Sequence, residues 1–408
     1  MRLFLKTFGC RVNQVESQAI LEEFASRGWA LSGMEEAELC LLNTCTVTHQ
    51  ADKDVEKLIR QISRRNPAAR IILTGCYASA HQEHIRHTFP NVEIIGKYDL
   101  GQKLFAAQDI CWTVSGHEGH SRAFIKIQDG CDCFCSYCIV PFARNVKRSK
   151  PATDVLKEIA GLVQKGFGEI VLTGINIGNF SCPQTGKDLA ALCRDIAGLE
   201  GRFRVRFSSI ELQTVSDGVI DVMAQRPDRF CNYFHLPLQS GCDSVLSAMN
   251  RHYNTAEYAQ KVALLRSKVK GIAIFADVIA GFPTETEENF ETTYRFISEQ
   301  KLCGLHVFSY SPRPLTKAAA WPQHKPEVIK KRAEKLRALD QELRSNFAAS
   351  LVGTQQEVFV EEFSGSAVKG VTSNFQQVWL ENALPDTKGL IRAKITRCEK
   401  SACYGEVL

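Results

Sequence analysis

Four cysteines crowd into one short stretch of the chain, residues 128–141, whose sequence is QDGCDCFCSYCIVP. With Cys133 left aside, Cys131, Cys135 and Cys138 follow the spacing Cys-x3-Cys-x2-Cys. Iron–sulfur clusters are usually held by four cysteine thiolates, and structural zinc sites also need four ligands. Three thiolates would close one face of a cuboidal cluster and leave its fourth iron open. The spacing therefore predicts an iron–sulfur site at which chemistry takes place.

Two other uses of these cysteines fit the sequence less well. Half of a zinc ribbon would need a second Cys-x2-Cys pair about 15 to 20 residues away, and the chain has none. A disulfide-bonded loop is at odds with the lack of a secretory signal. Cys133 could in principle replace Cys131 as the first ligand. Gly130 before Cys131 and the three-residue gap to Cys135 favour Cys131.

Length and composition predict an intracellular globular protein of two or three domains. The 408 residues are 44% hydrophobic and 23% charged, and the net charge of +5 is too small to identify a partner. Sixteen cysteines are too dilute over this length for a small disulfide scaffold. The apolar runs are too short for a signal peptide or a membrane span. We expect a cytoplasmic, soluble and reduced chain that does not contact a membrane.

The first hundred residues alternate between strand-like and helix-like segments, which is typical of a parallel α/β sheet. We expect strands at 2–7, 39–43 and 70–74, and helices at about 14–27, 51–65 and 80–89.

Three more cysteines, Cys10, Cys45 and Cys76, follow the ends of these three strands, each with glycine or threonine alongside. Ligands bind at the carboxyl ends of the strands in open α/β sheets, so thiols distant in sequence would meet at one point. Single cysteines at strand ends are often ordinary buried residues. Three in equivalent places favour a second three-thiolate cluster site.

The α/β pattern stops between Gly96 and Gly119, where we expect a linker near Cys111 to His120. Strand and helix segments then alternate again, with strands expected at 122–128, 169–173, 204–208, 233–236, 272–279 and 304–309. Such βα units wind right-handedly, and six of them make a partial barrel rather than a closed eight-stranded one.

The C-terminal part has a different pattern. Residues 322–346 predict one long basic helix, and the segments after Gly353 are short, β-rich and punctuated by glycines. We expect strands at 356–361, 368–372, 377–380 and 390–396, which would form a small antiparallel barrel.

A series of longer motifs runs through the whole chain. They are GCRVNQVES at 9–17, NTCTVT at 43–48, TGCYA at 74–78, the cysteine loop at 128–141, LTGINIG at 172–178, RFSSIE at 206–211, HLPLQSG at 235–241, DVIAGFP at 277–283 and HVFSYSPRP at 306–314. Together they resemble the radical-SAM methylthiotransferases, and within that family the MtaB-like branch that modifies tRNA.

The resemblance implies three domains and two 4Fe-4S clusters. A methylthiotransferase domain at 1–112 would hold an auxiliary cluster on Cys10, Cys45 and Cys76. A radical-SAM core at 117–345 and a TRAM RNA-binding barrel at 346–408 would follow, and Cys133 would be a bystander.

The resemblance also implies the reaction. The open iron on Cys131, Cys135 and Cys138 would chelate S-adenosylmethionine, whose reductive cleavage yields a 5′-deoxyadenosyl radical. The auxiliary cluster would carry the sulfur that a first S-adenosylmethionine methylates, and a radical from a second would activate the carbon that receives the methylthio group. Candidate contacts to S-adenosylmethionine follow the barrel strands or lie in the cysteine loop, although each is also compatible with an ordinary loop or core residue: Gly174, Asn176, Ser209, Glu211, Gln239 and Tyr137.

The implied target is C2 of N(6)-threonylcarbamoyladenosine at position 37 of tRNA, beside the anticodon. Thr46 and Val47 favour this branch, because relatives that modify isopentenyladenosine more often have Ser or Ala and Arg nearby. The chain departs from the family at Asn145, where a glycine is usual, and at residues 315–317, where Gly-Thr-Pro is usual.

A tRNA anticodon stem-loop is the expected partner, and basic side chains would supply affinity through its phosphates. We expect Arg144, Lys147, Arg148 and Lys150 to face the tRNA, whereas the charges of the long helix are more simply a solvated face. A flavodoxin-like or ferredoxin-like electron donor and a sulfur donor are also expected, and the chain is expected to be a monomer. The alternatives are methylthiolation of an aspartate of a ribosomal protein and a non-catalytic iron–sulfur RNA-binding protein.

Overall fold

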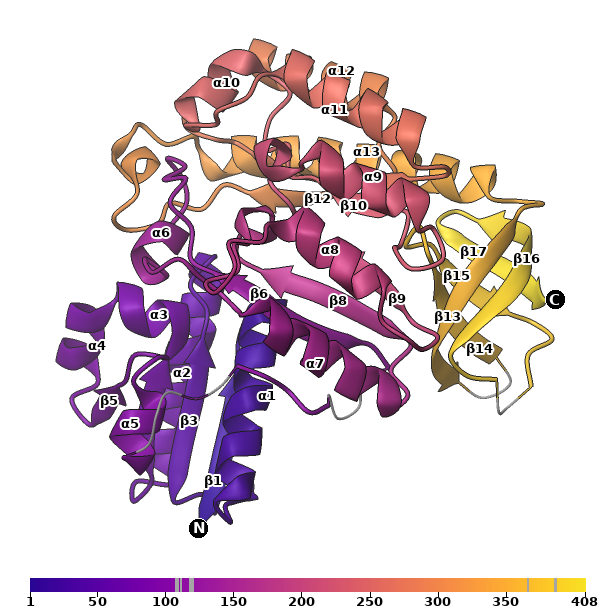
Figure 1. The fold of residues 1–408 in the computed structure, drawn as a ribbon. Coiled ribbons are helices and arrows are strands. Elements are labelled where there is room, and N and C mark those ends of the chain that lie inside the picture. The colour runs from indigo at the N-terminus through magenta and orange to yellow at the C-terminus, as the bar shows by residue number, and fades with distance from the viewer. Residues whose placement is uncertain (107–109, 111, 117–120, 365–366, 385–386) are drawn as a thin grey trace. The chain divides into compact units, whose positions relative to one another are not determined.

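The computed structural model describes residues 1–106, 110, 112–116, 121–364, 367–384 and 387–408 (Figure 1). These residues form two compact units. The first unit comprises Met1–Ser115, Gln128–Arg148 and Ser311–Ala320, and the second comprises Gly116–Ile127, Ser149–Tyr310 and Trp321–Leu408. The linker predicted near Cys111 to His120 lies largely outside the described residues. Because Gln128–Arg148 is part of the first unit, the cysteine loop belongs to the same unit as the N-terminal sheet.

The first unit is built on the predicted parallel sheet, with strand order β2-β1-β3-β4-β5. Its pairings are all parallel. Leu39–Thr44 is buried at every position, as expected of a central parallel strand. The strands are β1 (Arg2–Thr7), β2 (Ala30–Leu31), β3 (Leu39–Thr44), β4 (Arg70–Thr74) and β5 (Val92–Ile94), and the helices are α1 (Arg11–Ser26), α2 (His49–Arg65), α3 (Gly75–Ala80), α4 (Gln82–Thr88), α5 (Leu100–Phe105) and α6 (Val140–Ala143).

The six strands predicted for the partial barrel are present, and they belong to the second unit apart from Gln128 and Asp129 at the end of the first of them. They are β6 (Ala123–Asp129), β8 (Glu169–Gly174), β9 (Arg204–Phe207), β10 (Tyr233–His235), β11 (Ala273–Ala280) and β12 (Gly304–Ser309). The two sheets have the orders β7-β6-β8-β9, with β7 at Arg148–Ser149, and β10-β11-β12. A bridge between Ser209 and His235 connects β9 to β10.

Helices cover one face of these strands, as Figure 1 shows for α7, α8 and α9. Alternate residues of β11, namely Ile274, Ala276 and Val278, enter the large apolar core that the helices share. The helices are α7 (Ala152–Gln164), α8 (Leu189–Ala197), α9 (Asp217–Gln225), α10 (Asp243–Ala248), α11 (Thr255–Lys268), α12 (Glu287–Gln300) and α13 (Pro326–Ser350), and the short 3-10 turns are η1 (Ile177–Asn179), η2 (Leu212–Thr214) and η3 (Lys317–Ala320). The long helix α13 begins four residues later than predicted, at Pro326, a residue suited to the first helical turn.

Local sequence sets where several helices start. Asn254 caps α11, and Glu257 completes a reciprocal capping box with it. Thr286 caps α12 by accepting a hydrogen bond from the Asn289 amide.

The C-terminal segment forms the predicted small barrel, which is closed by five strands in the order β13-β14-β15-β17-β16. One pairing differs from the antiparallel expectation, because β15 runs parallel to β17. Strand β17 was not predicted. The strands are β13 (Gln355–Ser364), β14 (Ala367–Thr372), β15 (Gln377–Leu380), β16 (Leu390–Glu399) and β17 (Ala402–Val407).

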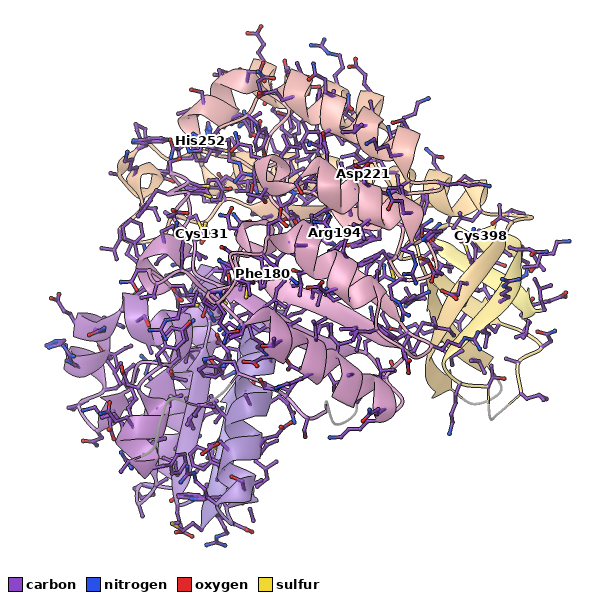
Figure 2. All side chains as sticks on the ribbon, viewed as in Figure 1. Cys131, Phe180, Arg194, Asp221, His252 and Cys398 are labelled. Carbon is purple, nitrogen blue, oxygen red and sulfur yellow. A yellow bond between two sulfur atoms is a disulfide. The ribbon has the colours of Figure 1, made fainter. Side chains whose placement is uncertain are left out.

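A disulfide joins Cys398 of β16 to Cys403 of β17, which face each other across the hairpin (Figure 2). The expectation of a fully reduced chain is therefore wrong at this pair. None of the helices in the described part of the chain is long and apolar enough to cross a bilayer.

A buried charged cluster joins this barrel to the strands of the second unit. The Glu169 carboxylate accepts hydrogen bonds from Arg204 at 2.7 Å and Arg206 at 2.9 Å. The same two guanidinium groups donate to backbone carbonyls of the barrel at Glu357, Val371, Thr372 and Ser373. Each of the three charged side chains is at most 1% exposed.

Candidate cluster sites and cofactor contacts

The structure brings Cys10, Cys45 and Cys76 together at the carboxyl edge of the N-terminal sheet. Cys10 precedes α1, Cys45 follows β3, and Cys76 lies in the first turn of α3 directly after β4. Burial and, to a smaller extent, the neighbouring Cys76 and Cys10 thiols raise the pKa of Cys45 to about 11. We call these three cysteines the auxiliary site.

Glycines allow the loops of the auxiliary site to approach each other closely. Gly9 has φ +91°, and a Cβ at this position would lie 2.5 Å from the Cys45 sulfur. Gly75 has φ +87°, and its Cβ would lie 2.5 Å from the Thr44 carbonyl oxygen. Both positions therefore require glycine. The soft thiolate donors and the tight glycine cradle fit an iron–sulfur cluster.

Buried polar side chains fix these loops to one another. The Asn13 amide donates to the carbonyls of Phe8 at 2.8 Å and Thr44 at 3.0 Å. The Thr44 hydroxyl donates to the Thr74 carbonyl and accepts from the Ala78 amide. The three strand ends are therefore held in place by the protein itself.

The cysteine loop brings Cys131, Cys135 and Cys138 together in the same way. The pKa of Cys131 is lowered by hydrogen bonds from Cys133, while the charges of Cys138 and Cys135 act in the opposite direction. We call Cys131, Cys135 and Cys138 the radical site; Cys131 is labelled in Figure 2. Gly130, at φ +78°, lies against the Val146 carbonyl, where a Cβ would clash. Three thiols and a glycine turn fit a three-thiolate cluster.

Cys133 lies beside the radical site. Its backbone amide donates to the Cys131 sulfur at 3.5 Å. It is therefore a neighbour of the first predicted ligand, and its role as a bystander stays a prediction.

Arg144 does not face solvent, so its predicted phosphate contact is wrong. Its side chain is 2% exposed, and it donates to Cys76, Glu16, Asp129 and Asn13. Two carboxylates and a thiol therefore hold this cation inside the first unit.

The other three basic residues of this segment differ among themselves. The Lys150 side chain is 9% exposed and is paired with Glu158, so its predicted phosphate contact is also wrong. Lys147 is exposed and paired with Asp132, and Arg148 is exposed and stacks over Tyr98.

The predicted S-adenosylmethionine contacts of the second unit follow β8, β9 and β10. Gly174 is the last residue of β8. Asn176 is buried and accepts a hydrogen bond from the Thr214 hydroxyl at 3.3 Å, and that hydroxyl also donates to the Glu211 carbonyl at 2.9 Å. Thr214 thus connects the loops after β8 and β9, and the role of these residues in binding the cofactor stays a prediction.

The remaining candidates have distinct surroundings. The Glu211 carboxylate pairs with Arg251, so it is already engaged by a buried cation. Gln239 has φ +68° and pairs with β11 through Val278. Ser209 bridges to His235, whereas Tyr137 is half-buried within the cysteine loop of the first unit.

Three side chains that the sequence predictions missed gather on the strands of the second unit. His235 of β10 and His306 of β12 both hydrogen bond to one carboxylate oxygen of Asp277 on β11, at 2.6 and 3.2 Å. These two histidines lower the pKa of Asp277 to about 2, against the effect of burial. Each residue opens one of the longer motifs, which was the signal that the sequence offered. In the folded sheet the parallel register of β11 and β12 pairs Asp277 with His306.

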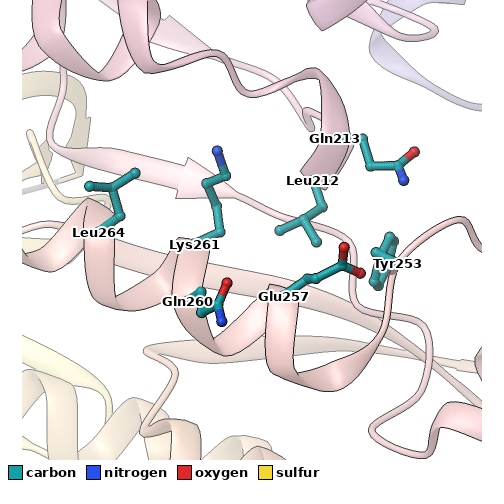
Figure 3. Close-up of a pocket in the computed structure, with 7 residues that line it drawn as sticks. All are labelled: Leu212, Gln213, Tyr253, Glu257, Gln260, Lys261 and Leu264. Carbon is teal, nitrogen blue, oxygen red and sulfur yellow. The ribbon is translucent and has the colours of Figure 1, made fainter.

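A pocket of about 300 Å³ lies between η2 and α11, and none of these three residues lines it (Figure 3). Its polar side chains already serve the fold: Glu257 completes the cap of α11, and Lys261 donates to the Val215 carbonyl.

Comparison with known proteins places this chain in a family. Residues 2–96 match the family described as uncharacterized protein family UPF0004, and residues 125–297 match the radical SAM superfamily. The Bacillus subtilis threonylcarbamoyladenosine tRNA methylthiotransferase MtaB is 35% identical, over 96% of this chain and 93% of its own length. The Dehalococcoides mccartyi tRNA-2-methylthio-N(6)-dimethylallyladenosine synthase is 34% identical, over 96% and 95%.

The fold has solved counterparts. The radical S-adenosylmethionine methyltransferase TsrM from Kitasatospora setae, solved with cobalamin and a [4Fe-4S] cluster bound, has a TM-score of 0.55 and 13% identity, over 78% of this chain and 77% of that one. This likeness supports the fold class alone. The near full-length identity to the curated relatives, together with the two matched domains, shows that the chain belongs to the radical-SAM methylthiotransferase family and is MtaB-like.

Proposed function

We propose that this protein adds a methylthio group to C2 of N(6)-threonylcarbamoyladenosine at position 37 of tRNA. The observation that carries the proposal is the near full-length similarity to threonylcarbamoyladenosine tRNA methylthiotransferases from several bacteria. The two separate groups of three thiols support it, because the reaction needs both a radical source and a sulfur source.

The auxiliary and radical sites would each hold one 4Fe-4S cluster through three thiolates. A cluster held by Cys131, Cys135 and Cys138 would, with S-adenosylmethionine, supply radical chemistry, and one held by Cys10, Cys45 and Cys76 would supply sulfur. The protein's own task is to hold these groups, to orient the nucleoside and to exclude water. Gly9, Gly75 and Gly130 leave the space, and Asn13 and Thr44 keep the loops of the auxiliary site in register.

Polar groups at the strand ends of the second unit would bind the S-adenosylmethionine. Gly174 would allow close backbone approach, and Asn176, Ser209, Glu211 and Gln239 would bind its polar groups. Because Glu211 is engaged by Arg251, we infer that it acts with that arginine as a neutral pair. Tyr137 would stack near the adenine.

We further propose that residues 1–112, 117–345 and 346–408 act as the sulfur-donating, radical-generating and RNA-binding domains of a cytoplasmic monomer. The anticodon stem-loop would be bound through exposed cations such as Lys147 and Arg148. Unpaired anticodon-loop bases would be recognised by stacking and by hydrogen bonds to their edges. A flavodoxin-like or ferredoxin-like reductant and a separate sulfur donor would complete the system.

The proposal is tested with anaerobically purified protein, S-adenosylmethionine and a chemical reductant. The substrates are tRNA carrying threonylcarbamoyladenosine, tRNA carrying dimethylallyladenosine, and a ribosomal protein with a target aspartate. Mass spectrometry of the digested products should show a methylthio group on threonylcarbamoyladenosine, together with 5′-deoxyadenosine. Products only on dimethylallyladenosine or only on the aspartate would contradict the nucleoside assignment. Absence of 5′-deoxyadenosine would favour the non-catalytic RNA-binding alternative.

Matched cysteine variants separate the sites from the fold. Cys10→Ala should abolish methylthio transfer, because the auxiliary site loses one of its three thiols. Cys193→Ala is the control, since that thiol is buried within α8 of the second unit and belongs to neither site.

A further inference from the structure

Arg144 follows the cysteine loop in sequence, yet its side chain reaches the auxiliary site. A guanidinium group has five N–H bonds, and here each one has an acceptor. The Nε–H donates to the Cys76 sulfur at 3.1 Å. Nη1 donates to carboxylate oxygens of Glu16 and Asp129, at N–O distances of 2.7 and 2.9 Å. Nη2 donates to the side-chain oxygen of Asn13 and to the second carboxylate oxygen of Glu16, at 2.6 and 2.9 Å. One of the five N–H groups of Arg144 therefore donates to a predicted cluster ligand, Cys76.

The acceptors of Arg144 are fixed by further contacts. Lys97 pairs with both Glu16 and Asp129, and the Tyr98 hydroxyl donates to Asp129 at 2.5 Å. Two carboxylates therefore balance two cations before any thiolate is counted. Rotation of the guanidinium away from this position would leave buried charges unpaired, which is strongly unfavourable.

Asn13 extends these contacts to the other two loops of the auxiliary site. Its side-chain oxygen accepts from Arg144, and its amide donates to the carbonyls of Phe8 and Thr44. Phe8 and Thr44 lie just before Cys10 and Cys45. Through Cys76 directly and through Asn13 indirectly, Arg144 contacts the loops that carry all three thiols.

We propose that Arg144 is a positioning residue of the auxiliary site, which holds the Cys76 thiolate and raises the reduction potential of the cluster bound there. The inference rests on the proposed function, because it requires a cluster on these three thiols. Hydrogen bonds to the sulfur ligands and nearby positive charge both stabilise the more negative, reduced form of a cluster. The segment that continues the radical site thereby sets an electronic property of the auxiliary site.

Lysine does not reproduce this arrangement. Its ammonium carries three donors on one nitrogen, whereas the planar fork of Arg144 spans a thiol, two carboxylates and an amide oxygen. Arg144→Lys therefore retains the charge but not the full set of hydrogen bonds. Arg144→Met removes both at similar side-chain length.

The test uses two backgrounds of the full chain. Alanine at all three cysteines of the radical site leaves only the auxiliary cluster, and alanine at all three of the auxiliary site leaves only the radical cluster. Iron is quantified in each, and the cluster potential is measured by redox titration followed by electron paramagnetic resonance. Lys6→Met, which removes an exposed cation of β1 in the same unit, is the control.

In the auxiliary-only background, Arg144→Met should favour the oxidised cluster at least about tenfold, which is a fall of about 59 mV for a one-electron couple. Arg144→Lys should give a smaller fall, and Lys6→Met none. The radical-only background should show no change with any of these variants.

Four results would decide against the proposal or support part of it. Unchanged potential with the iron retained in auxiliary-only Arg144→Met overturns it, and so does equal loss of iron from both backgrounds, which indicates a general folding defect. Loss of iron from the auxiliary-only background alone supports the holding role. Absence of iron from the auxiliary-only protein with Arg144 intact overturns the proposed function, and this inference with it.

Discussion

Replacing Glu169 by glutamine should loosen the C-terminal barrel from the strands of the second unit. The Glu169 carboxylate is fully buried and accepts three hydrogen bonds from Arg204 and Arg206, at 2.7, 2.9 and 3.1 Å. These ion pairs hold the pKa of Glu169 far below its usual range, although burial alone would raise it. The side chain is therefore an anion, and glutamine removes its charge while keeping its shape.

The magnitude follows from what remains after the substitution. Arg204 and Arg206 would keep their bonds to barrel carbonyls but would lose their shared counter-ion inside the protein. Removing one partner of a buried ion pair costs about 3 to 5 kcal/mol. At about 2 to 4 °C per kcal/mol for a unit of this size, the melting temperature should fall by on the order of 10 °C.

Thermal unfolding followed by circular dichroism measures this fall, and hydrogen exchange of the β13 and β14 amides localises it. Asp228→Asn is the control, because Asp228 and its partner Arg226 are 61% and 37% exposed. An exposed pair contributes about 1 kcal/mol or less. Equal shifts in Glu169→Gln and Asp228→Asn would refute the reasoning, because burial would then make no difference.

Three further predictions concern the cluster sites and the strands. Cys10→Ala should lower the iron content from about eight to about four atoms per chain, with Cys193→Ala unchanged; full iron in the first variant would count against the auxiliary site. Gly9→Ala should also lower iron towards about four, because φ is +91° and the new methyl would meet Cys45; iron quantitation at wild-type level would contradict this. Asp277, with a pKa of about 2 against an ordinary 3.8, should contribute about 2 kcal/mol of stability. A carboxyl group whose pKa is lowered by folding stabilises the folded state at pH values above its pKa in the unfolded chain. This contribution is therefore lost as pH falls from about 4 through 2. The difference in melting temperature between wild type and Asp277→Asn should shrink as pH falls from about 5 and vanish near pH 2, and a difference independent of pH over this range would sink the assignment.

Local patterns in the sequence predicted much of the fold. The nine strands predicted for the α/β sheets lie within a residue or two of their expected positions, because short apolar runs bounded by glycine and threonine are local signals. The short strands β2, β5 and β7 were not predicted. Strand β17 was missed because its residues alternate only weakly. The parallel pairing of β15 with β17 joins segments that are not adjacent in sequence, so no local turn could indicate it.

The polar contacts were harder to predict. Arg144 and Lys150 were expected to face tRNA phosphates because they are basic and follow the cysteine loop, yet acidic partners bury them: Glu16 is 128 residues from Arg144, and Lys150 pairs with Glu158. Asp277 and its two histidines also come from three separate strands. The pattern of charged residues in a sequence does not show which charged side chains pair in the folded protein.

The sequence by itself determined the two groups of three thiols and the sheet edges at which they lie, because cysteine spacing and strand periodicity are patterns among residues close in sequence. Only the tertiary structure decided which residue connects to these thiols. Arg144 became a partner of Cys76 because folding removes its guanidinium from water and leaves five donors to satisfy, and the acceptors come from segments up to 131 residues away.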